Sequence, residues 1–111
     1  MQEHKKNIIG GLNKLFDHRV RLGIMAMLLV SDRVDFNQLK AQLGITDGRL
    51  AGHLKALEEA KYIEVLKQFI GKRPNTSYHV TGAGREAFKE HLDALEHLLT
   101  LRENLPPRSS D

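Results

Sequence analysis

Apolar residues recur at helical spacing in five stretches of the chain, and each stretch predicts a helix. The predicted helices cover residues 3–16, 19–30, 37–43, 46–60 and 81–104. The second stretch is almost entirely apolar from Leu22 onward, so we expect this helix to lie at the centre of the fold. The first stretch contains Gly10 and Gly11, which weaken its helical tendency by about 1 kcal/mol each.

The hydrophobic period changes after the fourth predicted helix. Residues 62–70 are rich in β-formers and predict a strand, and residues 76–80 predict the returning strand. Between them, residues 71–75 combine Gly, Pro and Asn with two basic side chains, which is typical of a turn. The sequence therefore predicts a β-hairpin with a basic tip, and residues 34–36 predict a further, very short strand or an extended arm.

Glycine and hydroxyl residues mark the helix boundaries. Gly44 is suited to end the third helix in the left-handed conformation, and Thr46 and Thr81 are good N-caps for the last two helices. Asp17 is the expected N-cap of the central helix. Two helices joined by Gly44, Ile45 and Thr46 form a helix-turn-helix.

The order of these elements predicts a mainly α fold with a small β-hairpin. A bundle of three helices followed by a hairpin is the plan of a winged helix-turn-helix, here with extra N- and C-terminal dimerisation helices. We predict a single domain over residues 1–105 and a flexible tail over 106–111. Within the domain we expect an N-terminal helix (1–17), a winged-helix core (18–81) and a C-terminal helix (82–104).

The predicted helix-turn-helix and hairpin suggest how the chain binds DNA. The second helix of such a motif lies in the major groove with its N-terminal turn near base edges and phosphates. Arg49 lies in that turn, and Lys72 and Arg73 lie at the hairpin tip, where they can contact the backbone or the minor groove.

Several segments resemble the small winged-helix regulators related to MarR and ArsR. The resemblance covers roughly residues 16–90 and rests on the segments 36–40, 43–48, 53–60, 71–76 and 81–85. It implies a homodimer held by the terminal helices that binds a pseudo-palindromic operator, and a possible small-molecule effector of unknown identity. Relatives usually carry a larger polar residue at the position of Gly52 and a glycine at the position of Lys61.

Both lines of reasoning lead to one set of predicted DNA-binding residues. The set is Asn37, Lys40, Thr46, Asp47, Gly48, Arg49, Gly52, His53, Lys55, Lys72, Arg73, Asn75 and Thr76. The sequence leaves two readings of His53 open, contact with a base or partial burial at the edge of the helix. Asp47 is better explained as a carboxylate favoured by the helix dipole than as a base reader.

The last predicted helix carries a leucine seam. Phe88, Leu92, Leu95 and Leu99 are spaced by four, three and four residues, which is the spacing of a coiled-coil seam. We predict that they form a dimer interface, with Ile8, Leu12 and Leu15 of the N-terminal helix packing beside them.

Charge is unevenly distributed along the chain, whose formal net charge is +3. Residues 65–85 include four basic residues and no carboxylate, whereas residues 86–103 include five carboxylates and two basic residues. Double-stranded DNA is the partner that suits the first stretch, and the second should serve a different purpose.

Other classes of function find little support in the sequence. Without cysteine there is no disulfide, thiolate zinc site or cysteine nucleophile, and no phosphate-binding loop or catalytic triad pattern is present. Glu90, Asp93 and His97 share a helix, but we interpret them as solvated side chains and predict no metal, cofactor or enzymatic activity. The longest apolar run is too short to span a bilayer, so we expect no membrane association and a cytoplasmic location.

The sequence thus predicts a dimeric DNA-binding transcriptional regulator. Helix 46–60 would lie in the major groove, and the basic wing, residues 71–76, would contact the backbone or the minor groove. The alternative is a winged-helix module for protein–protein interaction that has no specific DNA binding.

Overall fold

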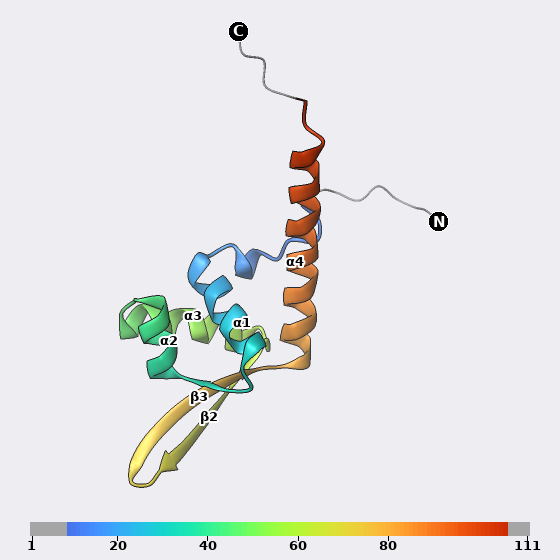
Figure 1. Ribbon diagram of the computed structural model, residues 1–111. Coiled ribbons are helices and arrows are strands. Elements are labelled where there is room, and N and C mark those ends of the chain that lie inside the picture. Colours follow the sequence, from blue (N-terminus) through green and yellow to red (C-terminus); the bar gives the residue numbers. More distant parts are fainter. Residues whose placement is uncertain (1–8, 107–111) are drawn as a thin grey trace.

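The structure, a computed structural model, describes residues 9–106 of the chain (Figure 1). Their elements are η1 (Lys14–Phe16), α1 (Arg19–Val30), β1 (Val34–Asp35), α2 (Phe36–Leu43), α3 (Asp47–Glu59), β2 (Ile63–Ile70), β3 (Arg73–Val80) and α4 (Gly82–Glu103). This is the winged helix-turn-helix that the sequence predicts. The helices form the body of the molecule, and β2 and β3 form the wing.

The helices begin at capping side chains. Thr46 accepts a hydrogen bond from the backbone N–H of Arg49 at the start of α3, as the sequence predicts. The start of α2 is a capping box, in which Asp35 and Gln38 each accept a hydrogen bond from the other's backbone N–H. The prediction of Asp17 as the cap of α1 is wrong, because the side chain of His18 caps that helix.

The core lies around α1, as its apolar sequence predicts. The fully buried side chains of the helices come from one stripe on each, and they meet aromatic residues of η1 and α4. The buried apolar residues are Phe16, Val20, Ile24, Met25, Leu28, Val34, Leu39, Leu50, Leu54, Leu57, Ile63, Tyr78 and Phe88. This cluster joins every described element, so the described residues share a single core.

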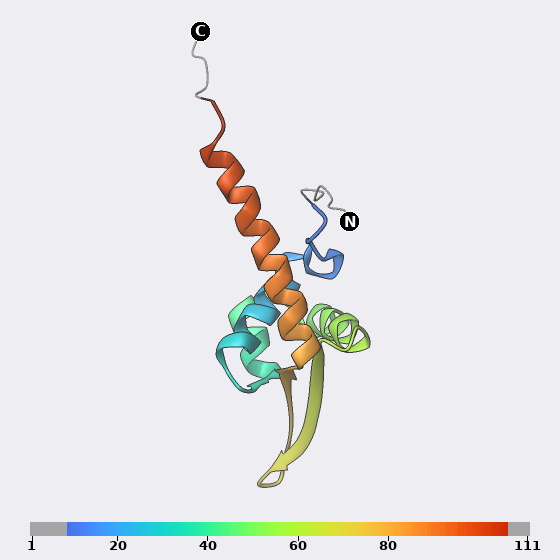
Figure 2. The ribbon, with the colours of Figure 1, turned by 90° about the vertical axis from the view of Figure 1, so that its right-hand side faces the viewer.

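The sheet is antiparallel with strand order β1-β3-β2. β1 pairs with β3 only at Val34↔Tyr78 and Asp35↔Ser77, whereas β2 pairs with β3 from Ile63↔Val80 to Ile70↔Arg73. The outer part of the wing is therefore a two-stranded ribbon, which projects away from the helices (Figures 1 and 2).

The wing turn is tighter than the predicted five-residue turn. Only Gly71 and Lys72 lie between the strands, and Gly71 has φ +66°, which matches the glycine at the first central position of a type II′ turn. Pro74 belongs to β3, opposite Phe69. It is tolerated there because β1 does not reach this part of β3.

The segment that follows α3 meets the start of α4 at a close contact that we call the α3–α4 joint, made by Lys61, Tyr62, Thr81 and Gly84. Thr81 donates hydrogen bonds through its hydroxyl to the carbonyl of Lys61 (2.7 Å) and through its backbone N–H to that of Tyr62 (2.9 Å). A Cβ at Gly84 would collide with the carbonyl of Tyr62, so this position requires glycine. Lys61 lies in the left-handed region at φ +69°.

The described part of the predicted N-terminal helix, residues 9–16, does not form an α-helix. Residues 9–11 form a turn, and a 3-10 helix over Lys14–Phe16 follows. Gly11 lies so close to α4 that a Cβ there would be 3.1 Å from that of Ala94. Gly11 therefore serves a close approach to α4, and the helical prediction is wrong for residues 9–13.

Candidate nucleic-acid interface

The helix-turn-helix is formed by α2, a short turn and α3. Gly44 has φ +62° and donates its N–H to the carbonyl of Lys40 (2.9 Å), which ends α2. Lys40 also forms an exposed ion pair with Asp47 (2.8 Å) across the turn. Such exposed pairs contribute about 0–1 kcal/mol, so this one adds little to stability.

α3 has one buried face and one free face. Leu50, Leu54 and Leu57 are buried on the first. The predicted DNA-binding residues Asp47, Gly48, Arg49, Gly52 and Lys55 are exposed. A Cβ added at Gly48 or Gly52 would meet nothing within 4 Å, so the free face is smooth and open.

His53 is held by contacts within the protein, which favours partial burial at the edge of the helix over contact with a base. Its Nδ1 accepts a hydrogen bond from Nε of Arg21 (3.0 Å), and its ring lies 4.2 Å from that of His18. Burial lowers the pKa of His53, and the nearby charges of His18, Arg21 and Arg49 lower it further. This side chain therefore fastens α3 to α1, which the sequence could not reveal because the partners are 32 residues apart.

The wing carries the other predicted contacts. Lys72 and Arg73 are exposed at its tip, and Asn75 and Thr76 are half-buried. A groove separates the wing from the start of α2, where Asn37 lies exposed. Its lining residues are Asp35, Phe36, Asn37, Lys67, Pro74, Asn75, Thr76 and Tyr78.

The groove is lined by three residues of the predicted DNA-binding set, Asn37, Asn75 and Thr76. It also adds Lys67, which our predicted set omitted. Lys67 pairs directly with Thr76, so the strand register alone would have placed the two side chains on one face. The predicted returning strand covered only residues 76–80, whereas β3 begins at Arg73, so the prediction did not give this register.

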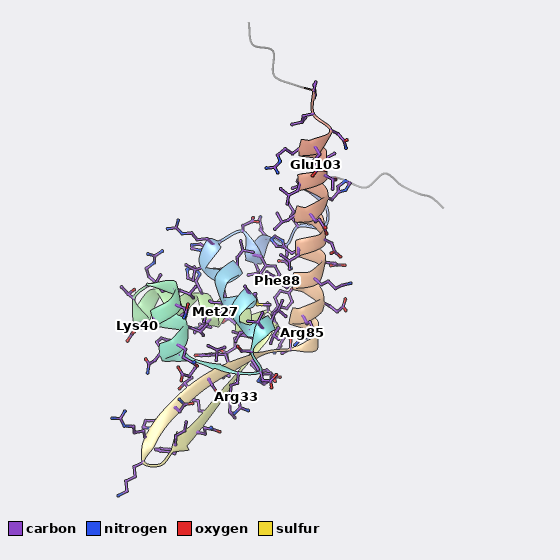
Figure 3. The ribbon with its side chains drawn as sticks, in the orientation of Figure 1. Met27, Arg33, Lys40, Arg85, Phe88 and Glu103 are labelled. Carbon is purple, nitrogen blue, oxygen red and sulfur yellow. The ribbon has the colours of Figure 1, made fainter. Side chains whose placement is uncertain are left out.

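Phe88 is not available to a partner subunit, which corrects the predicted seam. It is 3% exposed and packs edge-on against Phe16 at 5.1 Å, on the side of α4 that faces α1 (Figure 3). Leu12, Leu15 and Leu95 are half-buried, and Ile8 lies outside the described residues. Leu92 and Leu99 are 43% and 56% exposed, so they remain candidates for an interface.

His91 is a buried group that the sequence analysis did not single out. Its Nδ1 accepts a hydrogen bond from the backbone N–H of Asn13 (2.9 Å), and its ring lies 5.2 Å from that of Phe16. Burial lowers the pKa of His91, and the carboxylate of Asp17 offsets part of this effect. His91 thus fastens the N-terminal segment to α4.

Within residues 9–106, no group of three or more His, Asp or Glu side chains is placed to hold a metal ion. In the same range, none of the helices has the length and apolar character needed to cross a bilayer.

Comparison with known proteins agrees with this geometry. A model of the winged helix DNA-binding domain family matches residues 20–99. An uncharacterized protein of Methanocaldococcus jannaschii is 42% identical over 79 residues, which are 71% of this chain and 86% of that protein.

Two solved structures show the same arrangement. A transcriptional regulator homologue from Pyrococcus horikoshii OT3 superimposes with a TM-score of 0.70 and 32% identity, over 86% of this chain and 88% of that one. The crystal structure of MarR superimposes with a TM-score of 0.69 over 85% of this chain and 69% of that one. At 22% identity, MarR shares the fold.

Proposed function

This chain belongs to the winged helix DNA-binding domain family, and we propose that it is a transcriptional regulator that binds double-stranded DNA as a homodimer. Residues 18–81 would bind the DNA, and residues 82–104 would hold two subunits together. No catalytic step, metal or cofactor is needed for this role, and we place it in the cytoplasm.

The exposed face of α3 beside the wing, whose outer part beyond Glu64 has no carboxylate, carries this proposal. Arg49 and Lys55 on α3 and Lys72 and Arg73 on the wing are all exposed. The segment from Val65 to Arg85 adds no negative charge that would repel phosphates. α3 would enter the major groove through its smooth Gly48–Gly52 side, with Arg49 as the main base reader and the wing on the backbone or minor groove.

Dimerisation would come from the far half of α4. Leu92 and Leu99 are exposed there, and their seven-residue spacing places them on one face of the helix. This half of α4 projects from the body on the side away from the wing (Figures 1 and 2). Two copies joined there would present two α3 helices, which suits half-sites about 34 Å apart on one face of the duplex.

A salt titration of binding to random-sequence duplex DNA tests the proposal. The logarithm of the affinity should fall linearly with the logarithm of salt concentration, because each phosphate contact releases counterions. The double variant Lys72→Ala, Arg73→Ala should reduce the slope by about 2 for each subunit that binds. Arg49→Ala should reduce discrimination between operator and random DNA by about 1–3 kcal/mol.

A matched control uses basic residues away from the interface. Lys89→Ala, Arg102→Ala on α4 removes the same charge from exposed positions and should leave the slope unchanged. No detectable DNA binding by the parent protein at low salt would contradict the proposal and favour a protein–protein module. Equal loss of slope in both double variants would contradict the assignment of the wing.

A further inference from the structure

The tip of the wing exposes large apolar side chains. Phe69 is 71% exposed, and Ile70 beside it is 59% exposed. Phe69 lies directly opposite Pro74 in the strand register, so the two side chains share one face of the ribbon and form an apolar pair. We call Phe69 and Pro74 the wing-tip pair.

The wing-tip pair faces the helix-turn-helix. Closer to the body, the same face of the ribbon carries Val65 and Tyr78, which pack into the core. Pro74 itself lines the groove between the wing and the start of α2, together with Lys67 and Asn37. The pair therefore points to the side on which the DNA is proposed to lie.

The charges around the wing-tip pair indicate an anionic partner. Lys67 precedes Phe69 on the same face, and Lys72 and Arg73 lie in and next to the turn. No carboxylate occurs between Val65 and Arg85. An apolar pair ringed by cations is complementary to a duplex, whose phosphates flank a stack of apolar base faces.

A second copy of the chain is a poor match for this surface. The wing and the far half of α4, through which we propose that subunits pair, project in opposite directions (Figures 1 and 2). Wing tips of two copies would also bring like charges together, which opposes their association.

We propose that the wing-tip pair is a wedge that enters the minor groove and opens a base-pair step. This inference rests on the proposed function. Phe and Pro are among the side chains that insert between base pairs from the minor groove, and the adjacent cations hold the phosphates on either side. Pyrimidine–purine steps unstack most easily, so the wing would select DNA by deformability rather than by hydrogen bonds to bases.

Two synthetic duplexes of equal length test this wedge. One carries a TA step, with 2-aminopurine in place of its adenine, at the position under the wing, and the other carries a stiff A-tract there. Binding of the parent protein should raise the 2-aminopurine fluorescence, because the step unstacks, and should favour the TA duplex by roughly ten-fold. Phe69→Ser should abolish the fluorescence change and lose roughly ten-fold in affinity for the TA duplex.

Ile70→Ser is the matched control. It removes a similarly exposed apolar side chain from the other face of the same ribbon, and it should retain the fluorescence change and the preference. Both variants should melt at the temperature of the parent protein, because neither side chain is in the core.

The remaining outcomes show whether the wedge proposal alone fails or the proposed DNA binding fails with it. Binding by the parent protein with no fluorescence change, or Phe69→Ser binding as tightly as the parent, would overturn the wedge and leave DNA binding intact. A parent protein that binds neither duplex at low salt would overturn both. Self-association of the free protein that disappears in Phe69→Ser would overturn the wedge in favour of contact between wing tips.

Discussion

The wing and α4 both begin in the core and then leave it, but they carry opposite charge where they are exposed. The wing is buried at Ile63 and Tyr78 and ends with Phe69 among cations. α4 is buried at Phe88 and ends with exposed leucines among carboxylates. Exposed apolar side chains are therefore present on both, and the charge around them is what distinguishes the surface proposed for DNA from the surface proposed for a second subunit.

The largest expected difference between the wing and α4 is in the effect of a phenylalanine-to-alanine substitution on the free energy of unfolding. Phe88→Ala should lower the free energy of unfolding by about 3–5 kcal/mol, because it leaves a cavity beside Phe16. Phe69→Ala is the matched change at an exposed site and should stay within about 0.5 kcal/mol. Urea denaturation of both variants checks this, and similar losses would mean that the wing tip is buried in the native assembly.

The exposed leucines of α4 give the next largest effect. Leu92→Glu combined with Leu99→Glu should raise the dimer dissociation constant by roughly a hundred-fold, because apolar contact area is lost and charge is added. Sedimentation equilibrium measures this constant. Thr100→Glu, at an exposed position off the seam, is the control and should leave the dimer intact. A dimer that survives the double substitution would place the subunit interface elsewhere.

Acid should loosen the attachment of the N-terminal segment to α4. The pKa of His91 is lowered from its ordinary value of 6.5 by burial, so below about pH 6.5 the unfolded chain binds the proton more readily than the folded chain. The contribution of neutral His91 to the free energy of unfolding is therefore present above this pH and declines as the pH falls. His91→Asn, which keeps an acceptor for Asn13, should weaken this decline in denaturation curves at about pH 7.5 and about pH 5. An unchanged pH dependence in His91→Asn would exclude His91 as its source.

The last and smallest predicted effect, on the free energy of unfolding, is at the α3–α4 joint, from which both the wing and α4 extend. Lys61→Gly removes the strain of a left-handed residue and should raise the free energy of unfolding by about 1 kcal/mol. DNA affinity and dimer dissociation should stay unchanged, because no contact is removed. Thermal melting beside the binding assays tests this, and a loss of DNA affinity would show that the Lys61 side chain takes part in binding.

Elements whose signals are local could be predicted from the sequence. The bounds of α1, the stop at Gly44, the caps at Thr46 and Thr81 and the existence of the wing all follow from residues within a few positions of one another. These features suffice to give the winged helix-turn-helix and the exposed face of α3.

Features that depend on distant partners could not be predicted. Periodicity places Phe88 on the leucine seam, but only the packing of Phe16 shows that it belongs to the core of its own subunit. The bond between His91 and Asn13 joins residues 78 positions apart, and no local pattern indicates it. The irregular segment before η1 exists because Gly11 approaches Ala94, which a helical pattern cannot anticipate.

The α3–α4 joint has a mechanical consequence. Because Thr81 is bonded to Lys61 and Gly84 rests against Tyr62, the segment that follows α3 is tied to the start of α4. If two subunits pair through α4 as proposed, a change in the angle at which the two α4 helices cross would move the two α3 helices relative to each other. Anything that alters the crossing angle would then change the separation of the two α3 helices and, with it, the spacing of half-sites that fits.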